Sequence, residues 1–426
     1  MKMKQTEVGL IPDDWEVERF DELFSISTET VPLADINQRC YVGTENMMQD
    51  KKGVAENTIE LKYQNVREYR KDDILISNIR PYLKKIWFAD KDGGCSTDVL
   101  VFRKIRNTDN ANFLFKIVSD DRFFNIVNDN AVGTKMPRGD KNIIKQVLFA
   151  IPTDKEEQQR IAKALSDVDS LISTTEKLIQ KKKNIKQGTM QNLLTGKKRL
   201  PGFGPQIKSL AYKQTELGLI PEDWEVKNLG EIFSIKHGYG FEGQFFSSEN
   251  NQHIVVTPGN FKLEGGFQKQ KQPIYYTGTY PDEFKLKPND LIIMMTDLSK
   301  NSDTLGNPAI VPDDGNDYLH NQRIGLIQIH NDSFVKDYIY LLLCTKEYHE
   351  AVVATAAGST VKHTSPKRIY SIKLVVSTSK EEQTAIANVL SSMDKEIETL
   401  NTKLEKYRNL KTAMMQQLLT GKIRLV

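Results

Sequence analysis

Two long stretches of the chain carry hydrophobic residues at helical spacing, and they repeat each other. Each begins with Lys-Glu-Glu-Gln, at Lys155 and Lys380, and each ends with Leu-Leu-Thr-Gly-Lys, at Leu193 and Leu418. Both pairs of motifs are 225 residues apart (380 − 155 and 418 − 193), so the copies have equal length. Neither copy contains a proline, and at about 1.5 Å per residue each would form a helix roughly 60 Å long. The pattern predicts two matched long helices.

Within both stretches the apolar residues alternate at intervals of four and three, which is the heptad pattern of a coiled-coil seam. The predicted seam consists of Ile161, Leu165, Val168, Ile172, Ile179 and Leu193 in the first copy and Ile386, Leu390, Met393, Ile397, Leu400, Leu404, Tyr407, Met414 and Leu418 in the second. Because two matching helices lie in one chain, we expect them to pair with each other in antiparallel. The pair would act as a spacer whose outer faces dock partners; the alternative is a coiled coil between chains.

The middle of the first copy departs from this pattern. Lys182 and Lys186 fall on the seam, whereas Leu171, Leu178 and Ile185 lie beside it at intervals of seven. These three residues could complete a shifted apolar stripe, so the register here stays open.

A second repeat opens each half of the chain. Residues 4–17 and 213–226 are identical at 12 of 14 positions, at an offset of 209 (213 − 4). Glycine and proline within the repeat predict a turn, and Trp15 and Trp224 are expected to anchor it to a core. We assign these residues no binding role.

The chain therefore reads as repeat, head and long helix, twice over. Strands are predicted at 73–79, 99–102 and 143–151 with a helix at 112–127, and again at 290–295, 324–329 and 372–376 with a helix at 335–354. We place head one at 1–152, the first helix at 153–200, a linker at 201–213, head two at 214–378 and the second helix at 379–426. The prediction is an α+β fold: two mixed α/β heads in pseudo-two-fold arrangement, separated by an antiparallel coiled coil.

Composition narrows the classes of protein that fit. The 59 basic and 56 acidic residues give a net charge of +3, so an anionic partner must be met by local patches. The three cysteines form no C-x-x-C pair, which favours a reduced cytoplasmic protein without disulfides or zinc. The N-terminal residues lack an apolar segment and no apolar run reaches 18 residues, so we expect neither secretion nor membrane insertion.

Two segments resemble catalytic motifs, but neither has the surrounding residues that the chemistry requires. Gly238 to Gly243 matches G-x-G-x-x-G, but no strand–helix pattern of a nucleotide site follows it. In the segment from Pro281 to Lys285 the aspartate is adjacent to Glu-x-Lys, so the carboxylates cannot come from separate strands around a metal. We expect a protein that is not an enzyme and that binds no cofactor or metal.

Basic and hydroxyl-bearing residues gather instead at the predicted strand ends and in one loop of each head. Side chains of this kind grip phosphates and read base edges, so they are candidate DNA contacts. The candidates are Asn78, Arg80, Tyr82, Lys84, Lys85, Thr134, Lys135 and Arg138 in head one and Tyr239, Thr296, Asp297, Ser299, Lys300, Ser359, Thr360, Lys362, His363 and Lys367 in head two. For any single residue a solvated polar loop is the alternative.

With these motifs in this order, the whole chain resembles the specificity subunit of type I restriction–modification systems. The resemblance rests on the Gly-x-Ile-Pro-x-Asp-Trp openings at Gly9 and Gly218, the starts at Lys155 and Lys380, the ends at Leu193 and Leu418, Thr296-Asp297-Leu298, and the Gly358-Ser-Thr-Val-Lys-His loop. Head one departs from it, because Asn78-Ile79-Arg80-Pro81 stands at the strand end.

The resemblance implies two target recognition domains, each reading half of a bipartite double-stranded DNA site, and helices that fix the spacing of the halves. It also implies two adenine methyltransferase subunits and restriction or translocase subunits as partners. These partners would bring S-adenosylmethionine, ATP and magnesium. The alternatives are a free-standing DNA-modifying enzyme and a pseudo-symmetric DNA-binding repressor.

Overall fold

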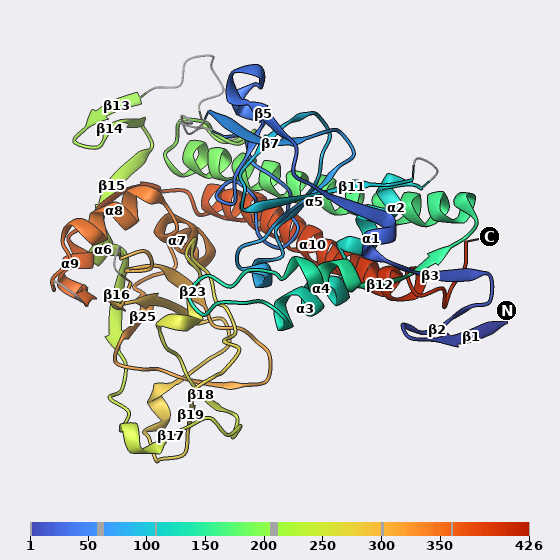
Figure 1. Ribbon diagram of the computed structural model, residues 1–426. Coiled ribbons are helices and arrows are strands. Elements are labelled where there is room, and N and C mark those ends of the chain that lie inside the picture. The colour runs from blue at the N-terminus through green and yellow to red at the C-terminus, as the bar shows by residue number, and fades with distance from the viewer. Residues whose placement is uncertain are drawn as a thin grey trace. The chain divides into compact units, whose positions relative to one another are not determined.

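The computed structural model describes residues 2–57, 64–106, 109–204, 212–299, 302–358 and 361–425. They form two compact units (Figure 1). Unit 1 comprises Met1–Lys177 and Asn401–Val426, and unit 2 comprises Leu178–Leu400. This division cuts through both long helices, so each unit holds one head and a part of each helix. The predicted division into heads, helices and linker stays a prediction, and residues 205–211 of that linker lie outside the described residues.

Unit 1 is built from short strands and short helices. They are β1 (Met3–Thr6), β2 (Gly9–Pro12), β3 (Trp15–Arg19), α1 (Phe20–Leu23), β4 (Phe24–Ser27), β5 (Thr30–Pro32), β6 (Tyr41–Val42), β7 (Asn65–Tyr69), β8 (Ile74–Ser77), β9 (Ile86–Phe88), β10 (Gly93–Cys95), β11 (Val99–Lys104), α2 (Ala111–Val118), α3 (Asp121–Asp129), α4 (Lys141–Gln146) and β12 (Leu148–Pro152). An antiparallel sheet has the order β4-β11-β8-β9, and a second sheet has the order β5-β7-β10-β6. The core packs Phe102 of the first sheet with Phe113 and Phe123 of the helices and with Leu165 and Leu418 of the long helices.

Unit 2 repeats this order with a larger second sheet. Its elements are β13 (Tyr212–Thr215), β14 (Gly218–Pro221), β15 (Trp224–Asn228), α6 (Leu229–Ile232), β16 (Phe233–His237), β17 (Phe246–Ser247), β18 (His253–Val255), β19 (Tyr275–Tyr276), β20 (Lys285–Leu286), β21 (Leu291–Met294), β22 (Thr296–Asp297), β23 (Pro308–Ile310), β24 (Asp317–Leu319), β25 (Ile324–Ile329), α7 (Lys336–Leu343), α8 (Lys346–Ala354), β26 (Lys362–His363), α9 (Pro366–Tyr370) and β27 (Lys373–Ser377). The sheet β16-β25-β21-β23 is the counterpart of β4-β11-β8-β9, and β17-β19-β18-β24-β20 is the larger second sheet.

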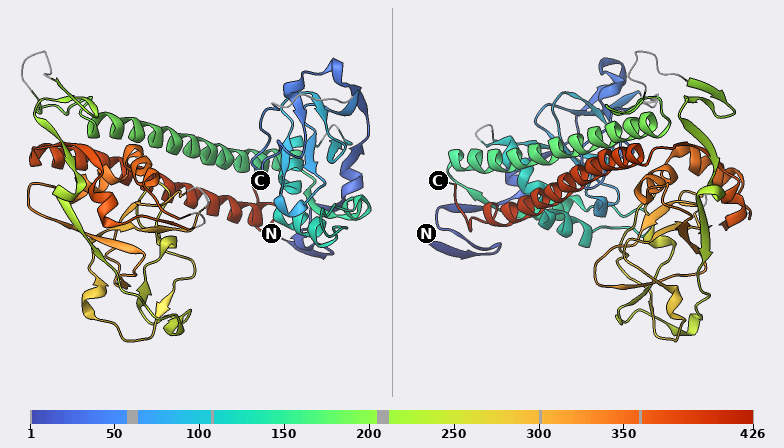
Figure 2. Two further views of the ribbon diagram at one scale, coloured as in Figure 1. Left: turned by 90° about the vertical axis from the view of Figure 1, so that its left-hand side faces the viewer. Right: turned by 180° about the vertical axis from the view of Figure 1, so that it is seen from behind.

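The long helices are α5 (Lys155–Leu194) and α10 (Lys380–Leu418), and they run side by side in opposite directions (Figure 2). In unit 1, Asp169 pairs with Lys411 at 2.6 Å. In unit 2, Lys186 pairs with Asp394 at 2.5 Å. Residue numbers rise along α5 as their partners' numbers fall along α10, so the pairing is antiparallel. The predicted antiparallel coiled coil and the α+β fold are confirmed.

Every residue of the predicted seam is buried or half-buried. By contrast Leu171, Leu178 and Ile185 are exposed, so the structure does not form the shifted stripe. In the polar middle of α5, ion pairs with α10 take the place of apolar contacts. Lys182 pairs with Glu396 at 2.7 Å, and Lys186 pairs with Asp394.

The repeated motifs lock the helix ends to the heads. Gly421, after α10, has φ +67°, and a Cβ there would lie 2.4 Å from the Cδ atom of Pro12. Gly196, after α5, has φ +70°, and its Cβ would lie 2.6 Å from Cδ of Pro221. Only glycine combines this backbone conformation with this close approach. The Leu-Leu-Thr-Gly-Lys motifs therefore fit against the proline of the other repeat.

The tryptophan of each repeat is buried in a core, as predicted, and the structure shows its polar partners. Trp224 is fully buried and its Nε1–H donates to Oε2 of Glu382 at 2.9 Å. The guanidinium of Arg199 binds the same carboxylate and Asp223. In unit 1 the same node joins Trp15 and Glu157 to Arg424, which follows α10. We call these the tryptophan–glutamate–arginine nodes.

Two predicted helices are wrong in their extent. The helix at 112–127 breaks into α2 and α3 because the Asp120 side chain accepts a hydrogen bond from the Arg122 N–H and caps a new helix. The helix at 335–354 breaks into α7 and α8 at the Thr345 cap. Part of the strand predicted at 143–151 is helical, because Asp140 caps α4 before β12 begins. Side-chain caps of this kind compete with a continuous apolar pattern.

Candidate nucleic-acid interface

In unit 1 the basic loop lies against the end of strand β8. The Arg80 N–H donates to the Pro137 carbonyl at 2.8 Å, and the Gly139 N–H donates to the Asn78 carbonyl at 3.2 Å. Residues 78–85 and 132–139 are therefore one surface, which we call the unit 1 junction. The structure brings together the two candidate segments of head one.

Unit 2 builds the same connection. Strand β22 pairs with β26, which places Thr296 opposite His363. The Thr364 N–H also donates to the Met295 carbonyl at 3.0 Å. We call residues 295–299, 357–358 and 361–368 the unit 2 junction. The candidates Lys300, Ser359 and Thr360 lie outside the described residues.

Some candidate DNA contacts of the unit 1 junction are exposed, and others are bonded to side chains or carbonyls of the protein itself. Arg80, Tyr82, Thr134 and Lys135 are exposed. Arg80 has φ +51°, a conformation uncommon outside glycine that fixes the turn beyond the strand. The exposed side chains are the ones free to meet a phosphate or a base.

Other candidates of the unit 1 junction already have protein partners. Lys84 pairs with Asp121 at 2.8 Å, and Lys85 donates to the Thr44 carbonyl at 2.6 Å. Arg138 pairs with Asp98, with 3.0 Å between Nη2 and Oδ1. Asn78 is half-buried, and its Oδ1 atom has no hydrogen-bond partner.

In unit 2 the side chain of Asp297 organises the loop. It is buried, and its carboxylate accepts hydrogen bonds from the Ser299 N–H at 2.6 Å and the Thr304 N–H at 2.7 Å. Burial raises the pKa of Asp297, but these hydrogen bonds outweigh it and hold the pKa below its ordinary value. This placement gives Asp297 a structural part in holding the strand end.

The outer side of the unit 2 junction is polar and basic. His363 and Lys367 are exposed, and Lys362 and Ser299 are half-buried. A hydrogen bond of 3.0 Å joins the Thr296 Oγ1 atom to Nδ1 of His363 and turns the ring. An open pocket of about 570 Å³ lies next to it, lined by Ser365, Lys367, Arg368 and Ser371. Two cations beside two hydroxyls suit a phosphate group.

Tyr239 forms a parallel β-bridge with Asn321, two residues before Arg323. Its ring packs on Phe241 and Phe284, with centroids 5.1 and 5.2 Å away. The carbonyl of Tyr239 accepts a 3.0 Å hydrogen bond from the Gln322 N–H. The carbonyl of Arg323, which follows Gln322, accepts a hydrogen bond from the Met295 N–H. Tyr239 is therefore held by the core and reaches the junction through one loop.

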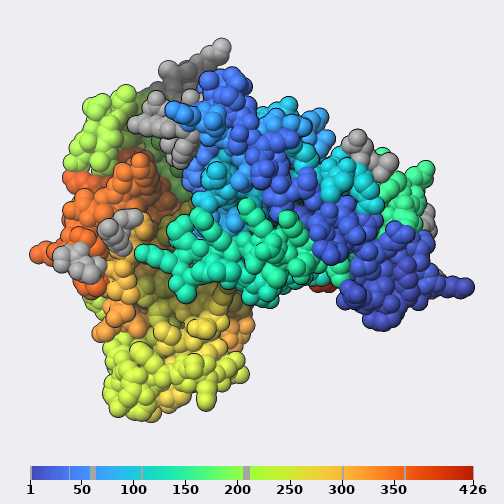
Figure 3. Space-filling view, viewed as in Figure 1, coloured from blue at the N-terminus to red at the C-terminus, as the bar shows by residue number. Residues whose placement is uncertain are grey.

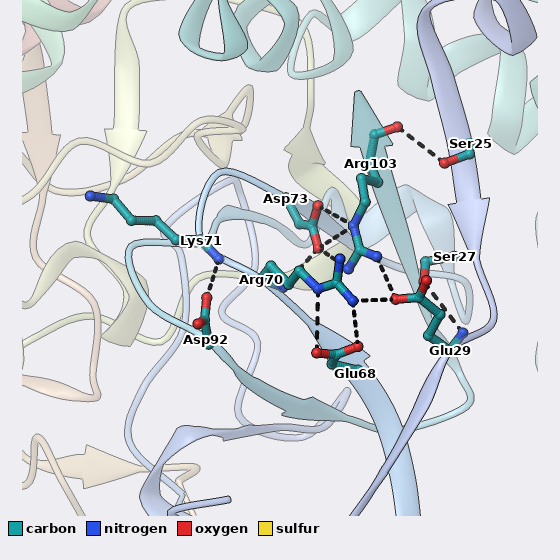
Figure 4. A network of polar contacts seen from close by, with 9 residues as sticks. All are labelled: Ser25, Ser27, Glu29, Glu68, Arg70, Lys71, Asp73, Asp92 and Arg103. Carbon is teal, nitrogen blue, oxygen red and sulfur yellow. Dashed lines mark hydrogen bonds and ion pairs between the residues drawn. The ribbon is translucent and has the colours of Figure 1, made fainter. Parts of the chain in front are cut away.

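Several other cations of unit 1 are neutralised within the protein. Arg70 and Arg103 share the carboxylate of Glu29, and Arg103 also binds Asp73 at 2.8 Å (Figure 4). Hydrogen bonding to Arg103 lowers the pKa of Glu29. This network ties strands β7 and β11 together and leaves little charge for an anionic partner.

The described residues contain no cluster of three metal-ligating side chains. Among the helices of the described ranges, none has the length and hydropathy needed to cross a bilayer. The three cysteine thiols are free.

Comparison with known families decides what this arrangement is. A family model described as type I restriction modification DNA specificity domain matches residues 12–187 and again residues 221–406. The chain belongs to this family. Its two matched regions fit recognition of a bipartite DNA site, and the chain is the DNA-recognition subunit of a type I restriction–modification system.

Relatives of this family match along almost the whole chain. The MjaVIII specificity subunit of Methanocaldococcus jannaschii is 26% identical over 422 residues, which cover 97% of this chain and 94% of the relative. The putative MjaX specificity subunit of the same organism is 25% identical over 441 residues, covering 99% and 96%.

Solved structures show the same fold. A crystal structure of the specificity subunit from M. genitalium superposes with a TM-score of 0.59 at 15% identity and covers 98% of each chain. A chain from a study of complex assembly and conformational transition of the type I system superposes with a TM-score of 0.55 at 18% identity and covers 97% of this chain and 99% of the other.

The sequence reading missed part of what positions this specificity subunit. It gave no role to Arg199 or Arg424, although they too are 225 residues apart (424 − 199). It also passed over Asp98 and Arg323, which stand at equivalent places beside the two junctions. The shared offset of 225 was the signal available in both cases.

Proposed function

We propose that each junction contacts one half of a bipartite DNA site, and that the chain itself catalyses no step. The observation that carries this proposal is that both units build a junction from a strand end and a basic loop. The same backbone connection occurs in both units, but its side chains differ. Two different half-sites require a common scaffold with different reading groups.

Contacts to phosphate and to bases would divide among the candidates. Arg80, Thr134, Lys135, Lys362 and Lys367 are cations or hydroxyls suited to the backbone. The chain as a whole is nearly neutral, so the arginine and the lysines of this set supply the local positive charge that DNA binding needs. The exposed Tyr82 ring would add contact with sugar or bases.

The helix pair would set the distance between the two half-sites. Helices α5 and α10 contain 40 and 39 residues without interruption, which favours a rigid spacer. We propose that its length fixes the number of unread base pairs.

The outer surface of the repeated parts would dock two methyltransferase subunits. Hairpins β1–β2 and β13–β14 and the ends of the long helices repeat closely, whereas the heads differ. Two copies of one partner need two matching surfaces. Hairpin β1–β2 projects from unit 1 (Figure 3), with Leu10 exposed on it, and Leu219 is exposed at the same place in unit 2. Restriction subunits, S-adenosylmethionine, ATP and magnesium would join through these partners, in the cytoplasm where the DNA lies.

Reconstitution with the adenine methyltransferase of the same system tests this proposal. The purified chain with S-adenosylmethionine and plasmid DNA should transfer no methyl group, and addition of the methyltransferase should produce adenine methylation at a split site. Methylation by the chain alone would favour a free-standing modifying enzyme. Tight sequence-specific binding without any affinity for the methyltransferase would favour a repressor.

A further inference from the structure

Two residues of opposite charge border the two junctions at equivalent positions. Asp98 directly precedes β11, and Arg323 directly precedes β25. The carbonyl of each accepts a 2.9 Å hydrogen bond from the residue that follows the neighbouring strand, Asn78 in unit 1 and Met295 in unit 2. The backbone therefore places Asp98 and Arg323 at the same point of the two sheets.

A second position of each junction is equivalent in the same way. Arg138 exchanges two 2.9 Å backbone hydrogen bonds with Val132, and His363 exchanges bonds of 2.8 and 2.9 Å with Ala357. Both pairs of positions have the same offset of 225 (323 − 98 and 363 − 138). Positions 98 and 138 of unit 1 thus correspond to positions 323 and 363 of unit 2.

The chemistry shown at these positions differs between the units. In unit 1, Asp98 and Arg138 form an ion pair whose side chains are 36% and 56% exposed. In unit 2, Arg323 is exposed, and its guanidinium makes no hydrogen bond or ion pair recorded within the described ranges. The Nδ1 atom of His363 is bonded to Thr296, so Nε2 is the ring nitrogen left for another partner.

A phosphate contact does not explain the unit 1 pair. The carboxylate of Asp98 cancels the charge of Arg138 and would repel a phosphate. A base pair suits it better. In the major groove guanine presents two acceptors, which arginine binds, and cytosine presents an amino donor, which a carboxylate accepts. An aspartate and an arginine held together as an ion pair can meet both edges of one G·C pair.

We propose that residues 98 and 138 in unit 1 and residues 323 and 363 in unit 2 determine which base pair each unit reads. The unit 1 pair reads a G·C pair through a donor and an acceptor together. The unit 2 pair lacks a carboxylate and reads the acceptor edge of a guanine through Arg323. This assignment rests on the proposed function, because it presumes that the junctions face DNA.

Selection from a random duplex library by the full chain, with its methyltransferase bound, tests the assignment. Arg323→Gln should lower the preference at one base pair of one half-site by roughly tenfold or more and leave the other half-site unchanged. Asp98→Asn should do the same in the other half-site. Arg19→Gln is the matched control, since Arg19 is exposed, pairs with Asp21 and lies outside both junctions.

A transplant sharpens the test. The double variant Asp98→Arg with Arg138→His places the unit 2 pair in unit 1, and its half-site should shift toward the guanine that Arg323 reads. Thermal unfolding of each variant should match the wild type, because these side chains lie at the surface.

The outcomes separate the assignment from the proposed function. If Arg323→Gln weakens binding equally for all sequences, or has no effect, the assignment is overturned while a split wild-type site keeps the proposed function. An unchanged half-site in the transplant also overturns the assignment. A wild-type complex without sequence preference overturns the proposed function itself.

Discussion

Removing the arginine from the tryptophan–glutamate–arginine node of unit 2 should destabilise that unit strongly. The perturbation is Arg199→Met, which keeps an apolar stem and deletes the guanidinium. The Arg199 side chain is 5% exposed and that of Glu382 is 0% exposed, so the substitution leaves a buried carboxylate without its counter-charge. Burial lowers the pKa of Arg199, but hydrogen bonds to Asp223 and Glu382 outweigh it and hold the pKa above its ordinary value.

The expected loss is about 3–5 kcal/mol, because breaking a buried pair by removing one partner costs that much. The second carboxylate, Asp223, is 55% exposed and adds roughly 0–1 kcal/mol. Arg19→Met removes an exposed pair and should cost less than about 1 kcal/mol. A rescue is also expected. Adding Glu382→Gln to Arg199→Met removes the stranded charge and should restore at least about 1 kcal/mol.

Hydrogen exchange is the suitable assay, because it reports each unit separately in a chain of two compact units. Protection of residues 224–228, strand β15, should fall by the predicted free energy in Arg199→Met, while that of residues 15–19, strand β3, should not change. A loss below about 1 kcal/mol, or a double variant less stable than Arg199→Met alone, would refute the reasoning.

Three further expectations follow from the junctions and the helix pair. Lys135→Ala and Lys362→Ala should each weaken DNA binding for all sequences and reduce the slope of affinity against salt by about 1; an unchanged slope in titrations at several salt concentrations means that the lysine does not touch phosphate. Deleting one heptad, or four residues, from both long helices should shorten the unread spacer in a map of methylated sites, and an unchanged spacer would contradict the proposal that the helix pair sets the distance between the half-sites. Burial raises the pKa of Asp169, but Lys116 and Lys411 outweigh it and lower the pKa below its ordinary 3.8. The stability from this carboxylate is therefore present above pH 3.8 and lost as the pH falls through the lower folded value, so the difference in unfolding free energy between wild type and Asp169→Asn should shrink in that acid range.

Long repeated patterns could be predicted from the sequence, because many residues contribute to each pattern and no single residue can hide it. The heptads of α5 and α10 and the two buried tryptophans needed only spacing and duplication. Helix breaks at Asp120 and Thr345 were not readable, since a single capping side chain overrides a continuous apolar pattern.

The partners of charged residues were harder to predict than the elements. Arg199 meets Glu382 across 183 positions, so no local pattern joins them. Asp297 looked like a reading group beside hydroxyls, but the fold turns its carboxylate onto backbone N–H groups of its own loop. At the junctions the sequence predicted which loops are basic, and the backbone register then showed which residues of the two units correspond.

The central claim is that two junctions read two halves of one site. Mapping methylated adenines on DNA treated with the full complex tests it most directly. The account predicts two short specific blocks separated by unread base pairs of constant number, with substitutions at the unit 1 junction altering one block and those at the unit 2 junction altering the other. A single continuous recognition sequence, or a junction substitution that alters both blocks alike, would contradict it.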